Sequence, residues 1–167
     1  MSEQTLSAPT RRHIVTRIAM AFGAVAVAPR ILAQSTVPDA RTSLHMDIDF
    51  KASPQRIYEA LLDAKQFATF SGLSAEIDPK AGGAFSIFQG QIGGRNVELV
   101  PNQRIVQAWR PSHWDPGVYS MVRFELKPGA PGTKLILDHT GFPAGSFESL
   151  SSGWHSHYFE PLKKFLV

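Results

Sequence analysis

His139 is the residue whose type and position best suit it to chemistry inside the protein. It shares one face of an alternating segment with Leu135 and Leu137, so we expect its imidazole to point into the domain. An inward imidazole serves either as a hydrogen-bonded core histidine or as a ligand contact or general base. Asp138 belongs to the opposite face and would not orient this ring directly. His139 is therefore the one candidate catalytic residue, with a core role as the alternative.

Other patterns that could support catalysis or metal binding are weak. His155 and His157 stand two residues apart, which on a helix turns them about 200° from each other, so they do not form a metal pair. The chain has no cysteine, which excludes thiolate sites. Gly145-Ser146-Phe147 lacks the glycines of a nucleophile elbow, and the paired glycines 82–83 and 93–94 suit hairpin turns better than a phosphate loop. We expect no metal and no cofactor.

Aromatic and aliphatic side chains with a few polar groups among them indicate a pocket for a small molecule. The residues that we expect to line this cavity are Phe85, Ile87, Trp109, Phe124, His139, Trp154 and Tyr158. A second cluster, Arg110, His113 and Trp114, lies around a strand end and would form the cavity rim, where Arg110 could hold an anionic head group. The alternative is an aromatic strand end that packs on the sheet edge.

The elements that must position these residues follow from the hydrophobic pattern. Residues 44–51 alternate between apolar and polar, which predicts a strand with one buried face. Ser53 and Pro54 are typical of a helix start, and a second short helix should cover residues 64–70. From 75 to 140 the strands are separated by short turns, which predicts an antiparallel meander. Apolar residues at spacings of three and four predict a final helix over 146–166, with Pro161 kinking it near His157.

The first 33 residues have the composition of an export signal. Arg11 and Arg12 precede a weakly apolar run over 18–28, which is too short to cross a bilayer that needs about 20 residues. An arginine pair in this position resembles twin-arginine signals. We expect a twin-arginine signal peptide over 1–33, a linker over 34–42 and one domain over 43–167. The protein would then be periplasmic or secreted, with the twin-arginine export machinery as a partner and no stable membrane span.

The positive net charge of +3 belongs to this leader. Four of the 17 Lys and Arg residues and one of the 14 acidic residues lie in the first 33 positions, so the rest of the chain is balanced. No basic stripe with interleaved aromatics follows, and this argues against a nucleic-acid partner.

Several segments together resemble a known superfamily. They are residues 50–61, the Gly82–Phe85 turn, Ile105–Arg110, Gly153-Trp154, Tyr158 and Pro161-Leu162. The chain resembles the SRPBCC superfamily of START-like and birch-pollen-allergen-like helix-grip proteins, in the branch of activator of heat-shock-protein ATPase homologues. The resemblance implies an α+β helix-grip fold: a curved antiparallel sheet of about six strands that wraps a long C-terminal helix, with two short helices after the first strand.

This resemblance, together with the residues, leaves three functions open. The leading hypothesis is an exported binding protein that holds a hydrophobic or amphipathic small molecule, such as a lipid, in an internal cavity. The second is a cavity enzyme of cyclase, hydrolase or isomerase type that would use His139; the residues favour a non-enzyme. The third is a co-chaperone-like protein-interaction module that would use an exposed sheet face, although an export leader argues against a cytosolic chaperone partner.

Overall fold

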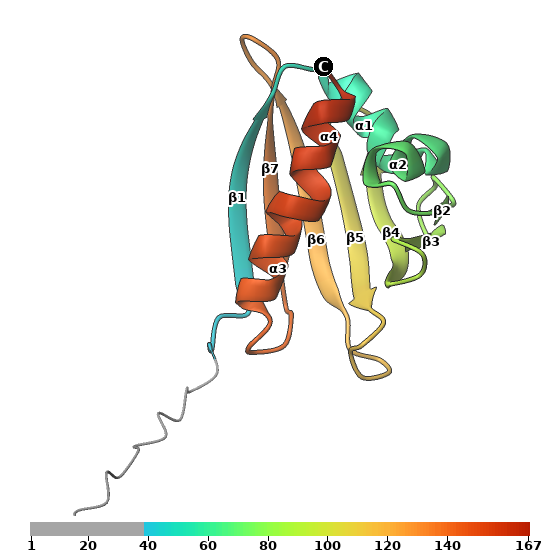
Figure 1. Ribbon diagram of the computed structural model, residues 1–167, viewed down its shortest axis with the longest axis vertical. Coiled ribbons are helices and arrows are strands. Elements are labelled where there is room, and N and C mark those ends of the chain that lie inside the picture. Colours follow the sequence, from blue (N-terminus) through green and yellow to red (C-terminus); the bar gives the residue numbers. More distant parts are fainter. Residues whose placement is uncertain (1–38) are drawn as a thin grey trace, which may run out of the picture. The chain divides into compact units, whose positions relative to one another are not determined.

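The computed structural model describes residues 39–167, in which one antiparallel sheet carries a long helical segment across one face (Figure 1). The expected signal peptide with Arg11 and Arg12, and most of the expected linker, lie outside the described residues. The last residues of that linker contact the C-terminal segment, because Arg41 donates to Glu148 at 2.8 Å and its guanidinium lies 3.3 Å from the centre of the Phe147 ring. Within residues 39–167, no helix is long and apolar enough to span a membrane.

The N-terminal elements form where their capping residues predict them. Strand β1 (Ser43–Phe50) alternates exposed and buried residues along its whole length. Helix α1 (Pro54–Leu62) starts at Ser53, whose hydroxyl accepts the backbone N–H of Arg56, and has Pro54 in its first turn. Asp63 caps helix α2 (Ala64–Ser71) in the same way, and Gly72 in the left-handed conformation ends it.

The remaining strands complete a seven-stranded sheet. They are β2 (Glu76–Ile77), β3 (Ala84–Ile87), β4 (Ile92–Val100), β5 (Arg104–Pro111), β6 (Ser120–Pro128) and β7 (Thr133–Thr140). The order across the sheet is β1-β7-β6-β5-β4-β3-β2, and every neighbouring pair is antiparallel. The predicted α+β class and meander are confirmed. The strand beyond the expected six or so is the two-residue β2, which is too short to leave a pattern in the sequence.

The C-terminal segment is helical throughout, but its middle is wider than an α-helix. Helix α3 (Phe147–Gly153) continues into the π-helix η1 (Trp154–Phe159) and then into helix α4 (Glu160–Phe165). The Glu160 N–H bonds to the carbonyl of His155, five residues back. Pro161 has no N–H to donate, and its ring would crowd the carbonyl four residues earlier in an α-helix. We attribute the π-helical stretch to this proline, at the place where the sequence predicts a kink.

Aromatic rings fill the space between the sheet and this helical segment. Phe124 is completely buried and lies nearly parallel to the Tyr158 ring, with centroids 5.9 Å apart. Trp109 of β5 stacks on Trp154 at 4.7 Å. Phe67 of α2 meets Tyr158 edge-on at 5.6 Å, which joins α2 to the same core. The region where the sequence predicts an internal cavity is therefore largely occupied by side chains.

Candidate functional site

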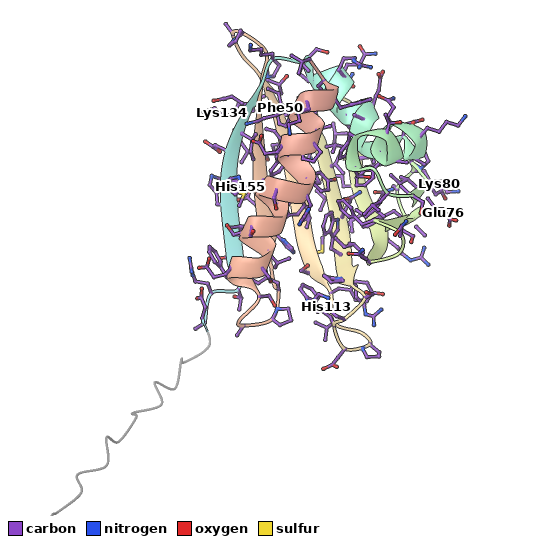
Figure 2. The ribbon with its side chains drawn as sticks, viewed as in Figure 1. Phe50, Glu76, Lys80, His113, Lys134 and His155 are labelled. Atoms are coloured by element: carbon purple, nitrogen blue, oxygen red, sulfur yellow. The ribbon has the colours of Figure 1, made fainter. Side chains whose placement is uncertain are left out.

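A groove of about 460 Å³ lies at the edge of the aromatic core, between the C-terminal helical segment, the turn after β3 and the loop after β5. Its rim contains exposed residues, so it opens to solvent. Figure 2 shows His113 on the loop beyond β5 and His155 on the helical segment in front of the sheet. The apolar wall of the groove comprises Leu73, Phe88, Ile92, Trp109, Leu150, Trp154 and Tyr158. The polar rim comprises Gln91, Ser112, His113, Ser149, Ser156 and His157.

An unusual turn after β3 places Phe88 in the wall. Phe88 and Gln89 have φ of 54° and 56°, the left-handed region that costs an L-residue free energy. The Gln89 N–H donates to the Ser74 carbonyl at 3.0 Å, and the Phe88 ring packs 5.3 Å from the ring of Phe67. These contacts hold a buried phenylalanine in a conformation that its own backbone disfavours. Only Gly90 signals this turn in the sequence, which is why Phe88 is absent from the predicted lining.

The helical wall has a gap at Gly153. A side chain added there would have no atom within 4 Å of its Cβ, so the glycine leaves open space where it borders the groove. Ser149 and Ser156, on the same wall, donate their hydroxyls to helix carbonyls at 2.9 and 2.7 Å. Their hydroxyl protons are therefore engaged within the helical segment.

A series of side-chain hydrogen bonds behind the groove wall fixes the orientation of the Trp109 ring. Its indole N–H donates to Oε1 of Gln107 at 2.9 Å, and Nε2 of Gln107 donates to Oδ1 of Asn96 at 2.8 Å. Asn96 in turn donates to the carbonyl of Asp78 at 2.9 Å. Asn96 and Gln107 face each other across β4 and β5, directly before a bulge at residues 96–98. Because buried amides are stable only when paired, this series of bonds locks the orientation of the indole.

His139 is buried in the core with both ring nitrogens hydrogen-bonded. Trp154 donates its indole N–H to Nδ1 at 3.1 Å, and Nε2 lies 2.7 Å from the Ser120 hydroxyl. Burial lowers the pKa of His139 from 6.5 to about 4, so the ring is neutral near pH 7. The residue is inward-facing, as its strand face predicts, but it does not border the groove. This geometry favours the core role, and a catalytic role stays a prediction.

The structure divides the predicted lining into two sets. Trp109, Trp154 and Tyr158 border the groove, and so does His113 from the predicted rim. The others are buried next to it in the core or support the loop: Phe85, Ile87, Phe124, His139, Arg110 and Trp114. Arg110 donates to the carbonyl oxygens of Trp114 and Asp115 at 3.0 and 3.3 Å, which ties its guanidinium to the loop after β5.

The opposite face of the sheet carries charged side chains in pairs. Arg123 of β6 and His45 of β1 both contact the carboxylate of Asp138 on β7, at 2.7 Å each. These contacts raise the pKa of His45 and, against partial burial, hold the pKa of Asp138 below its usual value. Among residues 39–167 no group of three His, Asp or Glu side chains is placed to hold a metal ion.

Comparison with known protein families and structures identifies relatives of this chain. The family model described as Activator of Hsp90 ATPase homolog 1-like protein matches residues 51–167. The chain belongs to this family. Its helix-grip fold matches the crystal structure of an Hsp90 activator from Plasmodium falciparum with a TM-score of 0.72 and 29% identity, covering 75% of this chain and 96% of that one.

Two curated relatives of the family are much longer than this domain. The chain is 31% identical over 122 residues to the activator of 90 kDa heat shock protein ATPase homolog of Dictyostelium discoideum, covering 72% of this chain and 32% of the relative. It is 31% identical over 124 residues to the mouse homolog 2, covering 74% of this chain and 38% of the relative. The chain thus spans about a third of the length of these relatives.

Proposed function

We propose that the protein binds an apolar or amphipathic small molecule in the groove. The observation that carries this is a groove of about 460 Å³ with an aromatic wall and a polar rim, which no Asp, Glu, Lys or Arg of residues 39–167 borders. Small-molecule sites typically occupy roughly 300–1,000 Å³, with mostly apolar walls and a few polar groups that orient the ligand. The chain Trp109–Gln107–Asn96 and the pair Trp154–His139 hold two of the wall indoles rigidly, so the site is formed before a ligand arrives.

The test is to fill the groove without disturbing the fold. Gly153→Leu places an aliphatic side chain in the open space beside the groove and improves helix propensity. Ser152→Leu adds the same side chain to an exposed neighbouring position outside the groove and is the matched control. We would titrate the full chain with N-phenyl-1-naphthylamine, an uncharged dye that brightens in apolar sites. We expect binding to wild type and to Ser152→Leu and at least tenfold weaker binding to Gly153→Leu; equal binding by all three would overturn the proposal.

A protein-interaction module is the second candidate. The relatives are activators of the Hsp90 ATPase, and this chain matches one third of their length. Val97, Tyr119 and Met121 are large apolar side chains exposed on or next to β4 and β6, away from the groove. If this candidate is right, the full chain binds purified Hsp90, Met121→Glu weakens that binding, and Gly153→Leu leaves it unchanged. Absence of binding by wild type would count against it.

We also propose that residues 1–33 direct export by the twin-arginine route, which makes the groove a periplasmic or extracellular site. The support is the Arg11-Arg12 pair before a short, weakly apolar run. Replacing both arginines by lysine keeps the charge and should leave the protein in the cytoplasm. Arg17→Lys is the matched control and should be exported normally. Export of the double variant would contradict the proposal.

A further inference from the structure

The Tyr158 hydroxyl differs from the indole N–H groups of the groove wall. Tyr158 is only 3% exposed and forms part of the wall. The indole nitrogens of Trp109 and Trp154 both donate to buried partners. The hydrogen bonds among residues 39–167 include none to the Tyr158 hydroxyl, although the ring that carries it packs against those of Phe67, Phe88, Trp109, Phe124 and Trp154.

The Tyr158 oxygen is not among the fully buried polar atoms that lack a partner, so it keeps access to water while the groove is empty. A ligand that fills the groove would displace that water, and burying a phenol without a partner is unfavourable. Because burial raises the pKa of Tyr158, its hydroxyl keeps its proton and can donate it in a hydrogen bond. A ligand in the groove can supply the missing acceptor. An oxygen with lone pairs at the inner end of the ligand would satisfy the phenol, whereas a hydrocarbon would leave it unpaired.

The charge of the wall restricts the ligand further. Within the described part of the chain, residues 39–167, no Asp, Glu, Lys or Arg borders the groove, and its ionisable side chains besides Tyr158 are His113 and His157 at the exposed rim. A charged group placed beside Tyr158 would be removed from water with no opposite charge next to it, which is strongly unfavourable. The inner polar group of the ligand should therefore be neutral.

We propose that the groove is specific for an uncharged carbonyl compound, whose oxygen accepts a hydrogen bond from the Tyr158 hydroxyl while its apolar body contacts the wall formed by Phe88, Trp109 and Trp154. This inference rests on the proposed small-molecule function. It adds the chemical class of the ligand, a ketone, aldehyde, ester or amide, and names Tyr158 as the residue that sets specificity.

The test compares ligands of equal shape. 2-Acetylnaphthalene carries a ketone, and 2-isopropenylnaphthalene has nearly the same size and shape with a CH2 group in place of the ketone oxygen. Both are titrated against the full chain by displacement of N-phenyl-1-naphthylamine. A neutral hydrogen bond gives a preference of about three- to tenfold, so wild type should bind the ketone that much more tightly. The anion 2-naphthoate at pH 8 should bind roughly tenfold or more weakly than the ketone.

The variant Tyr158→Phe removes only the hydroxyl, and we expect it to bind the ketone and the hydrocarbon equally. Tyr119→Phe deletes the same atom at an exposed position outside the groove and should keep the wild-type preference. If wild type binds both ligands equally, or if Tyr158→Phe keeps the preference, the carbonyl inference is wrong while groove binding stands. If neither ligand binds wild type, groove binding itself fails, and the inference fails with it.

Discussion

The indole N–H of Trp154 donates to Nδ1 of His139 across 3.1 Å, which determines the tautomer of this buried imidazole. An indole can only donate, so Nδ1 must accept, and the proton of the neutral ring sits on Nε2. Nε2 then donates to the Ser120 hydroxyl at 2.7 Å, and that hydroxyl lies 3.4 Å from the Trp109 carbonyl. A helix residue of the groove wall is thereby joined to the centre of the sheet.

This arrangement predicts a stability that depends on pH. The folded pKa of His139 is about 4 against 6.5 in the unfolded chain, so unfolding takes up a proton between these values. The contribution of His139 is therefore fully present above pH 6.5 and is lost as pH falls toward 4, a loss of up to about 3 kcal/mol. Urea unfolding between pH 4.5 and 8 should show this slope, which His139→Gln should flatten. A variant with an unchanged slope would contradict the assignment.

His45 should act in the opposite direction on the outer face. Its exposed ring lies against Asp138 and Asp47, which raises its pKa. Its contribution is present below its unfolded pKa and is lost as pH rises through the raised folded value. His45→Gln should therefore leave the loss of stability toward pH 4 that we assign to His139 in place. It is the matched histidine control for the same urea series.

Removing the Trp154 indole nitrogen should lower the free energy of unfolding by more than the smaller volume of the new side chain explains. Trp154→Phe leaves Nδ1 of His139 buried without a donor and opens space beside Phe124, and we expect a cost of about 2–4 kcal/mol. Trp114→Phe is the control, because no hydrogen bond of the Trp114 indole occurs within residues 39–167. Equal losses for the two variants in urea unfolding would show that the bond to His139 contributes little.

The stability of the protein should be equally sensitive to substitution of the hydrogen-bonded amides behind Trp109. Gln107→Leu keeps the size of the side chain but leaves the Trp109 N–H and Oδ1 of Asn96 without their partners, at about 1–3 kcal/mol for each group. Gln103→Leu makes the same exchange at an exposed position and should change the free energy of unfolding by about 0.5 kcal/mol or less. Thermal unfolding of the two variants gives the comparison, and similar midpoints would contradict it.

Two adjacent glycines in β4 should respond differently to an added methyl group. At Gly94 a Cβ would overlap the carbonyl oxygen of Ala108 and the Phe85 ring, whereas at Gly93 the nearest atom is 3.7 Å away. Gly94→Ala should therefore cost about 2 kcal/mol or more, and Gly93→Ala about 0.5 kcal/mol or less. Circular dichroism during urea unfolding measures both. A mild effect at Gly94 would mean that β4 can move away from β5.

The sequence predicts the fold well where one face of an element is buried. The period-two pattern of β1 and β7 identifies the inward face and so places Leu135, Leu137 and His139 correctly. Ser53 and Pro54 predict the start of α1 because capping is a local interaction. The position of the site is harder to predict. Whether rings leave a cavity depends on how Phe124, Trp154 and Tyr158 interdigitate, and no residue pattern records that packing.

Several groove residues outside the predicted lining depend on local backbone geometry. Phe88 reaches the groove through a left-handed turn that tertiary contacts stabilise against local preference. Gly153 matters through the side chain that it lacks, and Ser156 and His157 border the groove from the π-helical stretch. Phe88, Ser156 and His157 thus depend on a backbone geometry that residue propensities do not encode.

The central claim is that the groove is the binding site. The most direct test is to follow the backbone and indole N–H chemical shifts of the full chain during titration with 2-acetylnaphthalene. The account predicts saturable shifts at Gly153, Ser112, His113 and the indole of Trp154, with none at Val97 or Met121 on the opposite face. Shifts confined to that opposite face, or none at saturating ketone, would contradict it.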